Sequence, residues 1–574
     1  RSEPVRTPAR CAEEAGLSAA AVRFVQRTAP AVLPPTDMHP VLARLLASRG
    51  VDVAGETGYP LKALPSPTGF KDMQAASARI VEAIESGQSI LVVGDFDADG
   101  ATSSAVAVRG LRALGAQSVD YLVPNRFDFG YGLSPPLVEE AARRGPDLII
   151  TVDNGISSHA GVAAANACGI DVVVTDHHLP GATLPDAVAI VNPNQSACGF
   201  PSGALAGVGV MFYVLVAVRA GLRARGVAPE QLPNLANLLD LVALGTVADV
   251  VPLDAVNRIL VAQGLARIRA GACCEGIKAL LQVDAKSFAS LSTRDLAFSA
   301  APRLNAAGRL SDMSLGIECL LTDDPERAAA LASELDRLNR SRKDKEGDMR
   351  EQAFAAADQL FRDADGVDAG LCLFDPDWHE GLVGLVASRV KDRFRRPVLA
   401  FTRASEAGML KGSGRSIEGI HIRDLIEAVD TAQPGVITKF GGHAMAAGLS
   451  LKESGFADFK AAWAELSERA LAALGPVDEV LTDGSLATDE MTLELARLLR
   501  VAAPWGKDFP EPLFEGTFTV RERRVVGETH AKLKLAAVGG RRDFDAIAFG
   551  EADNPALVRG CHRLRRVPRR WRHP

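Results

Sequence analysis

Three apolar segments that each end in acidic or imidazole side chains constrain the fold of this 574-residue chain most strongly. Residues 90–93, 147–152 and 171–174 are short, nearly continuous apolar runs, and the segments between them have helical patterns. Such strands are typical of a parallel sheet that helices cover on both faces. Parallel sheets carry their ligand sites at the carboxyl ends of the strands. The sequence therefore predicts an α/β domain in which the residues after these strands converge.

The first strand leads into three aspartates at alternate positions, Asp95, Asp97 and Asp99. Carboxylates this close repel one another and are costly to keep ionised unless a cation lies among them. The same spacing opens an EF-hand calcium loop, but Val106 occupies the position of its bidentate glutamate, and a calcium loop lies between two helices. A solvated acidic turn is the other alternative. The repulsion favours metal ligands.

The other two strands end in further ligand types. Asp153 follows the second strand, and Asp176, His177 and His178 follow the third. Asp249, after an apolar segment that starts at residue 238, is a fourth contribution. A single histidine is often a satisfied core residue, but mixed carboxylate and imidazole groups at one sheet edge suit manganese or magnesium better than structural zinc. We therefore predict a divalent metal centre.

Length and composition give expectations about domain number, nucleic-acid binding, zinc sites and membrane contact. The chain is too long for one core and predicts about three or four domains. Its net charge of −7 gives no basic signature overall, although a local basic groove is sufficient for nucleic acid. The eight scattered cysteines lack zinc-site spacing and favour a reducing compartment. Residues 204–218 are too short an apolar stretch for a membrane span and predict a buried helix, so we expect a cytoplasmic protein without membrane contact.

Several motifs of the chain resemble those of the DHH phosphoesterases. The four family motifs are matched by Gly-Asp-Phe-Asp-Ala-Asp-Gly at 94–100, Val-Asp-Asn-Gly at 152–155, Asp-His-His at 176–178 and the segment around Asp249. The likeness continues through residues 124–126, 130–134 and 301–310 and covers most of the chain from about residue 33 to 549. Within the family it points to the single-strand-specific 5′→3′ exonucleases of bacteria, which act in DNA repair and recombination and release 5′-mononucleotides.

The resemblance implies an α/β fold in which a long helix joins a parallel-sheet DHH domain to a second α/β domain of the DHHA1 type, followed by a β-barrel of the OB-fold. The implied parts are an extension of unknown role at 1–35, the DHH catalytic domain at 36–321, the long helix at 322–362, the DHHA1-type domain at 363–474 and the OB-fold-like domain at 475–574. Residues 559–574 are arginine-rich and replace the expected final strands of the barrel. We also expect a short helix at 19–26 and a solvated face at 339–350 of the long helix.

The resemblance also implies roles for single residues. Two Mn²⁺ or Mg²⁺ ions would share Asp153, with Asp95, Asp97, Asp99, His177 and Asp249 as the remaining ligands. Asp153 and His178 would be catalytic, and His178 would contact the scissile phosphate or assist proton transfer. The substrate-binding residues would be Arg126, Tyr131, Arg303, Asn305, Ser413, Arg415 and His443. The implied partner is single-stranded DNA, with a single-strand-binding protein and a RecQ-type helicase as candidate protein partners.

Two alternatives remain open at this point. A DHH enzyme acting on short oligonucleotides or cyclic dinucleotides would share the two catalytic domains, although a long helix and a third domain favour a longer substrate. A non-catalytic relative would bind single strands as a scaffold, although it would have no use for a convergent set of metal ligands. A metal-dependent nuclease assay separates the scaffold from an enzyme.

Overall fold

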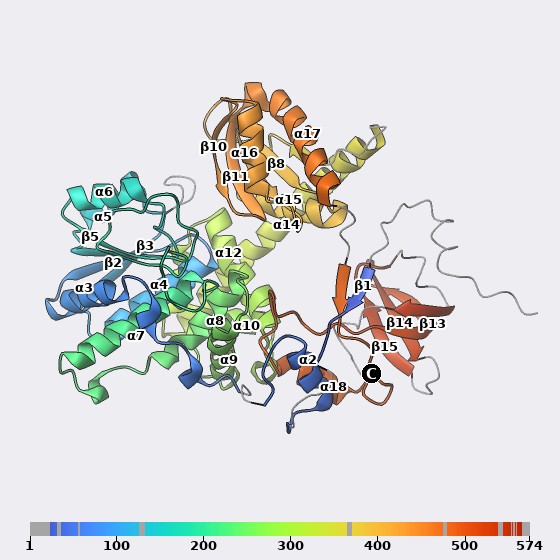
Figure 1. The fold of residues 1–574 in the computed structure, drawn as a ribbon, viewed down its shortest axis with the longest axis horizontal. Coiled ribbons are helices and arrows are strands. Elements are labelled where there is room, and N and C mark those ends of the chain that lie inside the picture. The colour runs from blue at the N-terminus through green and yellow to red at the C-terminus, as the bar shows by residue number, and fades with distance from the viewer. Residues whose placement is uncertain are drawn as a thin grey trace, which may run out of the picture. The chain divides into compact units, whose positions relative to one another are not determined.

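The computed structural model describes residues 23–30, 36–54, 58–124, 132–363, 370–474, 479–537, 543–552, 554, 557 and 560–564. These residues form two compact units (Figure 1). One unit consists of Asp336–Asp478 with Arg309–Ser311, and the other of Val22–Gly308, Asp312–Leu335 and Glu479–Pro574.

A five-stranded parallel sheet forms the centre of the larger unit, in the order β3-β2-β4-β5-β6. Its strands are β2 (Ser89–Val93), β3 (Ser118–Leu122), β4 (Leu148–Val152), β5 (Asp171–Thr175) and β6 (Ala189–Val191). In this doubly wound order the chain leaves β2 first towards β3 and then returns past β2 to β4. The loops after β2 and β4 therefore diverge at a topological switch point, which is the usual ligand site of such sheets.

Helices cover both faces of this sheet, as its apolar strands predict (Figure 1). On one face α5 (Pro135–Arg143) and α6 (His159–Ala167) pack against Leu91, Ile149 and Val172. The other face is covered by α3 (Met73–Glu85), α4 (Ala98–Ala113) and α7 (Gly207–Ala224). By length and composition α7 could cross a membrane, but 61% of it is buried inside the protein. The buried helix predicted from residue 204 is thus confirmed as α7.

Further helices extend this part of the unit. They are α8 (Leu239–Ala248), α9 (Ala255–Arg269), α10 (Glu275–Gln282), α11 (Thr293–Asp295), a π-helical turn η6 (Leu296–Ala300), α12 (Ala301–Leu310) and α13 (Ser314–Leu321). Short 3₁₀ turns are η1 (Leu61–Ala63), η2 (Pro67–Gly69), η3 (Pro229–Gln231), η4 (Leu235–Leu238) and η5 (Phe288–Ser290). Helix α8 packs against α4 and α9, so its C-terminal end is fixed close to the loop after β2.

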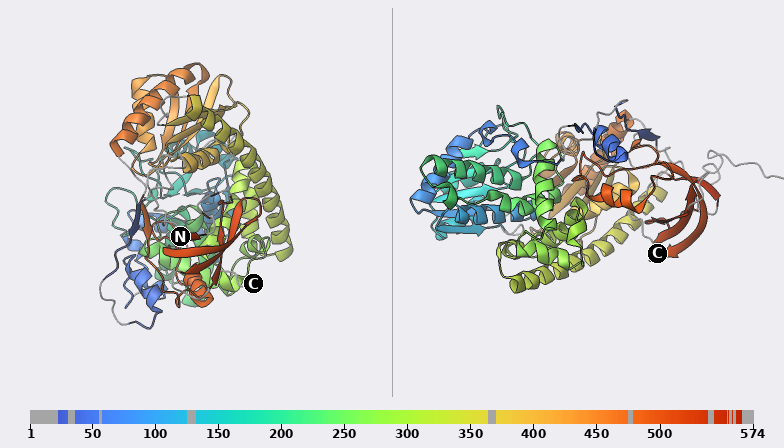
Figure 2. Two further views of the ribbon diagram at one scale, coloured as in Figure 1. Left: turned by 90° about the vertical axis from the view of Figure 1, so that its right-hand side faces the viewer. Right: turned by 90° about the horizontal axis from the view of Figure 1, so that it is seen from below.

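The long helix is α14, whose 39 residues run from Pro325 to Asp363 without interruption (Figure 2). Its start is as predicted, because Asp324 Oδ1 accepts a hydrogen bond from the Glu326 N–H at the first turn. The predicted solvated face at 339–350 is only partly correct. Glu346 is buried and bonds to Arg342 and Arg389 at 2.7 and 2.9 Å, because a later helix, α15 (Val383–Phe394), supplies Arg389.

The smaller unit contains a mixed sheet in the order β10-β11-β9-β8-β7, in which only β7 and β8 are parallel. Its strands are β7 (Leu371–Phe374), β8 (Val398–Arg403), β9 (Met409–Arg415), β10 (Ile437–Gly442) and β11 (Ala446–Lys452). Residues of α14 and of α15 (Val383–Phe394) share one apolar core with the sheet. A second core involves α16 (Ile422–Ala432) and α17 (Phe456–Leu474), which the turn η7 (Glu453–Gly455) precedes.

The C-terminal part of the larger unit is an antiparallel sheet in the order β15-β14-β13-β16. Its strands are β13 (Gly516–Val526), β14 (His530–Ala537), β15 (Asp543–Ala548) and β16 (Gly560–Leu564). From the sequence we predict that residues 559–574 replace the final strands of the barrel. This prediction is wrong for the first residues of the segment. Residues Gly560–Leu564 pair with β13, which gives this basic segment a place in the sheet.

The N-terminal segment joins this C-terminal part. The short helix predicted at 19–26 is wrong where it can be compared, because Arg23–Gln26 forms β1, which pairs in parallel with β12 (Glu479–Thr482). Helix α2 (Pro40–Ala47) packs its Val41 and Leu45 against α18 (Leu493–Val501). The pairing partner lies more than 400 residues away in the chain, so no local pattern indicates it.

A buried ion pair fixes this junction. The Arg49 Nη1 and Nη2 atoms lie 2.7 and 2.9 Å from the two carboxylate oxygens of Asp483, and both side chains are almost fully buried. Asp483 Oδ2 also accepts the Leu513 N–H at 2.8 Å. The pair therefore links the segment after α2 to the chain after β12.

We predict that Arg49→Met lowers the free energy of unfolding by about 3–5 kcal/mol, because it leaves the Asp483 carboxylate buried without its main partner. A urea titration of the purified variant measures the change. Arg225→Met is the matched control, since the Arg225–Glu85 pair is exposed and such pairs contribute only about 0–1 kcal/mol. An equal, small effect of both substitutions would contradict the role given to Arg49.

Candidate metal centre

The acidic and imidazole side chains predicted from the strand ends meet at the carboxyl edge of the parallel sheet. Three groups have ligand atoms within 4.8 Å of one another. They are Asp95 with Asp97 and Asp153, Asp99 with His177 and Asp249, and Asp153 with His177 and His178. Asp153 and His177 each belong to two of the groups, so the three groups overlap, and each could hold a cation.

The loop after β2 is held by hydrogen bonds to the start of α4. Asp97 is the N-cap of α4, and its Oδ1 accepts the Gly100 N–H at 3.0 Å. Asp99 lies in the first turn of α4 and is buried. Its carboxylate accepts the N–H groups of Gly207 and Val208 at 2.6 and 3.1 Å, at the start of α7. The N–H groups at the start of α7 and the positive ends of α4 and α7 thus face Asp99.

Asp153 is placed by an unusual backbone conformation. Its φ of 61° lies in the left-handed region, which aspartate tolerates better than most residues. A Cβ atom at Gly207 would come within 2.6 Å of the Asp153 Cβ, so only glycine allows this approach of α7. Asp153 Oδ1 is buried and accepts no hydrogen bond from the residues that the structure describes. A buried carboxylate oxygen in this state needs a cation.

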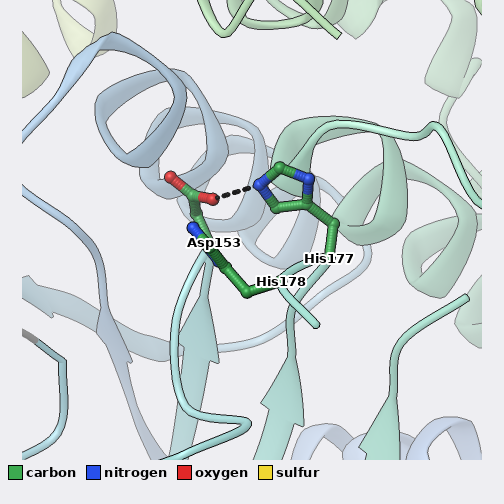
Figure 3. A group of neighbouring side chains, drawn as sticks. All are labelled: Asp153, His177 and His178. Carbon is green, nitrogen blue, oxygen red and sulfur yellow. Dashed lines mark ion pairs between the residues drawn. The ribbon is translucent and has the colours of Figure 1, made fainter. Parts of the chain in front are cut away.

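His177 contacts Asp153 from the end of β5 (Figure 3). Its Nε2 lies 3.1 Å from Asp153 Oδ1 and 3.5 Å from Asp249 Oδ2. Burial and the nearby His178 lower the pKa of His177 to about 4, against the opposing effect of Asp176. The imidazole is therefore neutral at neutral pH, which is the state that binds metals.

The carboxylates at this edge carry more negative charge than the protein alone can stabilise. Burial, followed by repulsion from Asp97, raises the pKa of Asp99 to about 7. Burial and repulsion from neighbouring aspartates, first Asp99, raise the pKa values of Asp153 and Asp249 well above their usual range. The donor set of carboxylates and imidazole, without a thiolate, fits a hard divalent cation such as Mn²⁺ or Mg²⁺. A cation would relieve the repulsion and restore the ionised state.

His178 is held in a different state from His177. Its Nδ1 lies 2.7 Å from Asp176 Oδ1. Burial alone would lower the pKa of His178, but the hydrogen bond and charge of Asp176 outweigh it and raise the pKa to about 9. Asp176 responds in the opposite sense, because its bonds with His178 outweigh burial and lower its pKa to about 2. His178 is thus a cation at neutral pH beside the ligand cluster.

Two of the predicted substrate-binding residues, Asn305 and Arg303, are described in the larger unit. Arg126 and Tyr131 lie outside the described residues. Asn305 Oδ1 accepts the Ala98 N–H at 2.9 Å and so supports the start of α4. Arg303 is 4% exposed and binds Asp284 through two hydrogen bonds of 2.7 and 3.0 Å. Asn305 thus contacts the loop that carries the aspartates, and Arg303 is bound to Asp284, while substrate contact by either residue stays a prediction.

The remaining three belong to the smaller unit. Ser413 and Arg415 lie on β9, where Arg415 Nη1 donates to Ser413 Oγ at 3.1 Å and to the Gly414 carbonyl at 2.7 Å. Burial lowers the pKa of Arg415, and among the described residues no carboxylate pairs with it. A Cβ at Gly384 would meet both side chains within 3 Å, so a glycine leaves room beside them. His443 is exposed after β10.

Sequence reasoning did not identify the roles of Asp176 and Gly207. The sequence places Asp176 among the residues that converge at the sheet edge, but its hydrogen bond to His178 is visible only in the structure. Gly207 stands in the segment Ala-Gly-Val-Gly-Val at 206–210, which opens the most apolar helix of the catalytic sheet. A glycine at the start of a buried helix is a signal for close backbone approach to an anion, and it could have indicated this contact.

Comparisons with known proteins agree with this geometry. Family models match in three places: the DHH family, N-terminal domain at residues 89–246, the DHHA1 domain at 368–469 and the RecJ OB domain at 482–565. They confirm the predicted fold class, an α/β DHH domain joined by a long helix to a DHHA1-type domain and followed by an OB-fold domain.

Curated relatives and solved structures cover nearly the whole chain. The single-stranded-DNA-specific exonucleases RecJ of Salmonella typhimurium and Escherichia coli are each 54% identical over 518 residues, which is 90% of this chain and 90% of theirs. The crystal structure of RecJ in complex with Mn²⁺ from Thermus thermophilus has a TM-score of 0.76 at 31% identity and covers 96% of this chain and 79% of that one. A structure of exonuclease RecJ bound to manganese has a TM-score of 0.60 at 36% identity, over 73% of this chain and all of the other. The chain therefore belongs to the RecJ family of single-stranded-DNA-specific exonucleases, within the DHH family.

Proposed function

We propose that the protein is a metal-dependent exonuclease that degrades single-stranded DNA in the 5′→3′ direction and releases 5′-mononucleotides. The observation that carries this proposal is the overlap of three ligand groups at the carboxyl edge of the sheet, where Asp153 and His177 each belong to two groups. The relatives described above are single-stranded-DNA-specific exonucleases, and solved RecJ structures contain Mn²⁺ or Mg²⁺. We also propose that the protein acts in DNA repair and recombination in the cytoplasm. Its proposed protein partners are a single-strand-binding protein and a RecQ-type helicase. The domain limits given above are part of the same proposal.

The ligand groups divide between two cations. Asp95, Asp97 and Asp153 would hold one, and Asp99, His177 and Asp249 the other, with Asp153 available to both. Such a metal pair, when bound, supplies a nucleophilic hydroxide near neutral pH and neutralises charge on the phosphodiester. Neutral His177 presents a lone pair to its site because its pKa is low.

His178 would act on the substrate. Its imidazolium carries a proton at neutral pH, and Asp176 fixes its ring through the 2.7 Å contact at Nδ1. The Nε2–H would donate a hydrogen bond to a phosphate oxygen or pass its proton to the leaving oxygen as the phosphodiester is cleaved. The charge of His178 also favours an anionic substrate at an edge that carboxylates would otherwise make repulsive.

Polarity requires that one end of the strand be recognised, because a two-metal site can accept a strand in either direction. We assign the 5′ phosphate to Arg415 and Ser413, which lie on β9. Arg415 is largely buried and has no carboxylate partner among the described residues, so its charge is available to an anion. A guanidinium group offers paired donors to phosphate oxygens and stays charged at working pH.

We predict that Asp153→Ala lowers turnover of single-stranded DNA by at least the roughly 10–100-fold that loss of an outer metal-site partner costs. The fold should persist, because the substitution removes one of several mutually repelling carboxylates. Strand binding should also persist. A nuclease assay with Mn²⁺, together with a filter-binding assay, measures both properties.

Asp147→Ala is the matched control for that experiment, since Asp147 stands at the opposite end of β4 and accepts the Ser89 N–H. This control should digest DNA normally. Near-normal turnover by Asp153→Ala would show that the metal centre has been wrongly placed. Strand binding without Mn²⁺-dependent digestion by the unchanged protein would instead favour a scaffold.

We predict that Arg415→Ala discriminates less between 5′-phosphorylated and 5′-hydroxyl strands, with a loss of about 1–3 kcal/mol in kcat/KM on the phosphorylated substrate. Measuring kcat/KM for both strands with both enzymes tests this. Arg403→Ala, on the neighbouring strand β8, removes an exposed arginine that pairs with Glu453 and should leave the ratio unchanged. Equal losses on the two substrates would rule out Arg415 as the phosphate contact.

A further inference from the structure

The peptide backbone of the two histidines is held entirely by side chains. Asp176 Oδ1 accepts the N–H groups of His177 and His178 at 2.7 and 3.0 Å. The His177 carbonyl accepts a hydrogen bond from Asn194 Nδ2 at 2.6 Å, and the His178 carbonyl accepts one from Asn192 Nδ2 at 2.9 Å. All four polar groups of the dipeptide are therefore satisfied by three side chains.

In the described part of the chain, the His177–His178 peptide makes no strand pairing that could substitute for these side-chain hydrogen bonds. The described pairing of β5 with β6 ends at Thr175, and the two histidines lie in the irregular loop that follows. A loop without such pairing is free to move unless other groups bind its backbone. Side-chain hydrogen bonds thus fix the peptide that carries both rings, and the His177 ring also bonds to the backbone of Leu205.

The two asparagines are themselves fixed by the sheet. They follow β6, the strand next to β5, so strand pairing sets where they begin. Asn192 is fully buried, and its Oδ1 accepts the Asn194 N–H at 2.7 Å while its Nδ2 donates to His178. A carboxamide can donate on one side and accept on the other in this way. A neutral amide also adds no negative charge to a site already crowded with carboxylates.

We propose that Asn192 and Asn194 are positioning residues of the metal centre, which hold the His177–His178 peptide so that His177 meets the cation site and His178 meets the substrate. This inference rests on the metal centre of the proposed function. His177 Nε2 must stay within ligand distance of the cation that Asp153 and Asp249 also approach, and a small shift of its peptide would break that geometry. Asn194 acts on the metal ligand directly, since it binds the His177 carbonyl.

The test uses Asn194→Ala and Asn194→Asp in the full chain. Asn194→Ala removes the donor, and the nearly isosteric Asn194→Asp places a carboxylate oxygen against the His177 carbonyl. Asn166→Ala is the matched control, because Asn166 Nδ2 makes the same kind of bond to the Asp186 carbonyl at 2.8 Å on an exposed surface. Titration calorimetry with Mn²⁺ alone, thermal melting of the metal-free protein, and kcat and KM on single-stranded DNA are measured for each.

We expect both Asn194 variants to bind Mn²⁺ about 10–100-fold more weakly and to lose kcat by a similar factor. KM for the strand and the melting temperature of the metal-free protein should stay close to those of the unchanged protein, as should every property of Asn166→Ala. Unchanged Mn²⁺ affinity in both Asn194 variants would overturn the proposal. A lower melting temperature with unchanged Mn²⁺ affinity would also overturn it, since that pattern describes a purely structural residue.

Asp153→Ala separates this inference from the proposed function. If Asp153→Ala loses Mn²⁺ binding while both Asn194 variants keep it, the metal centre stands and only the positioning role fails. If Asp153→Ala binds Mn²⁺ as tightly as the unchanged protein, the metal centre itself is wrongly assigned.

Discussion

Mutual repulsion among buried carboxylates is the constraint on which the catalytic part of this protein depends. Asp99 and Asp153 are buried beside the partly exposed Asp249, and burial and mutual repulsion raise the pKa values of all three. A fold would not retain such an arrangement for its own stability, because each charge costs free energy. The protein offsets part of this cost with helix N-termini and with cationic His178, and bound divalent cations would offset the rest.

The doubly wound sheet explains how residues so far apart in the chain come together. The loops after β2 and β4 flank the switch point, and β5 adds the two histidines on the next strand. Helix α8 brings Asp249 to the same edge by packing against α4. Two glycines make the final approach feasible, since side chains at Gly207 and Gly245 would collide with Asp153 and Asp99. The candidate ligands therefore lie in loops whose positions the sheet and its packed helices determine.

The strand ends and their ligands could be predicted because apolar runs and acidic turns are local patterns in the sequence. Other features depend on partners distant in the chain. Strand β1 pairs with a strand more than 400 residues later, and Glu346 is buried because Arg389 of another helix binds it. Arg303 was expected to contact substrate, but its pairing with Asp284 became visible only in the fold. The amides of Asn192 and Asn194 carry no charge, so no repulsion in the sequence pointed to them.

The central claim is that two divalent cations bind on either side of Asp153. Anomalous diffraction from crystals grown with Mn²⁺ tests it most directly, because the scattering locates each ion without reference to activity. The account predicts two maxima about 3.5–4 Å apart, one beside Asp95 and Asp97 and the other beside His177 and Asp249. A single maximum, or maxima away from Asp153, would contradict it.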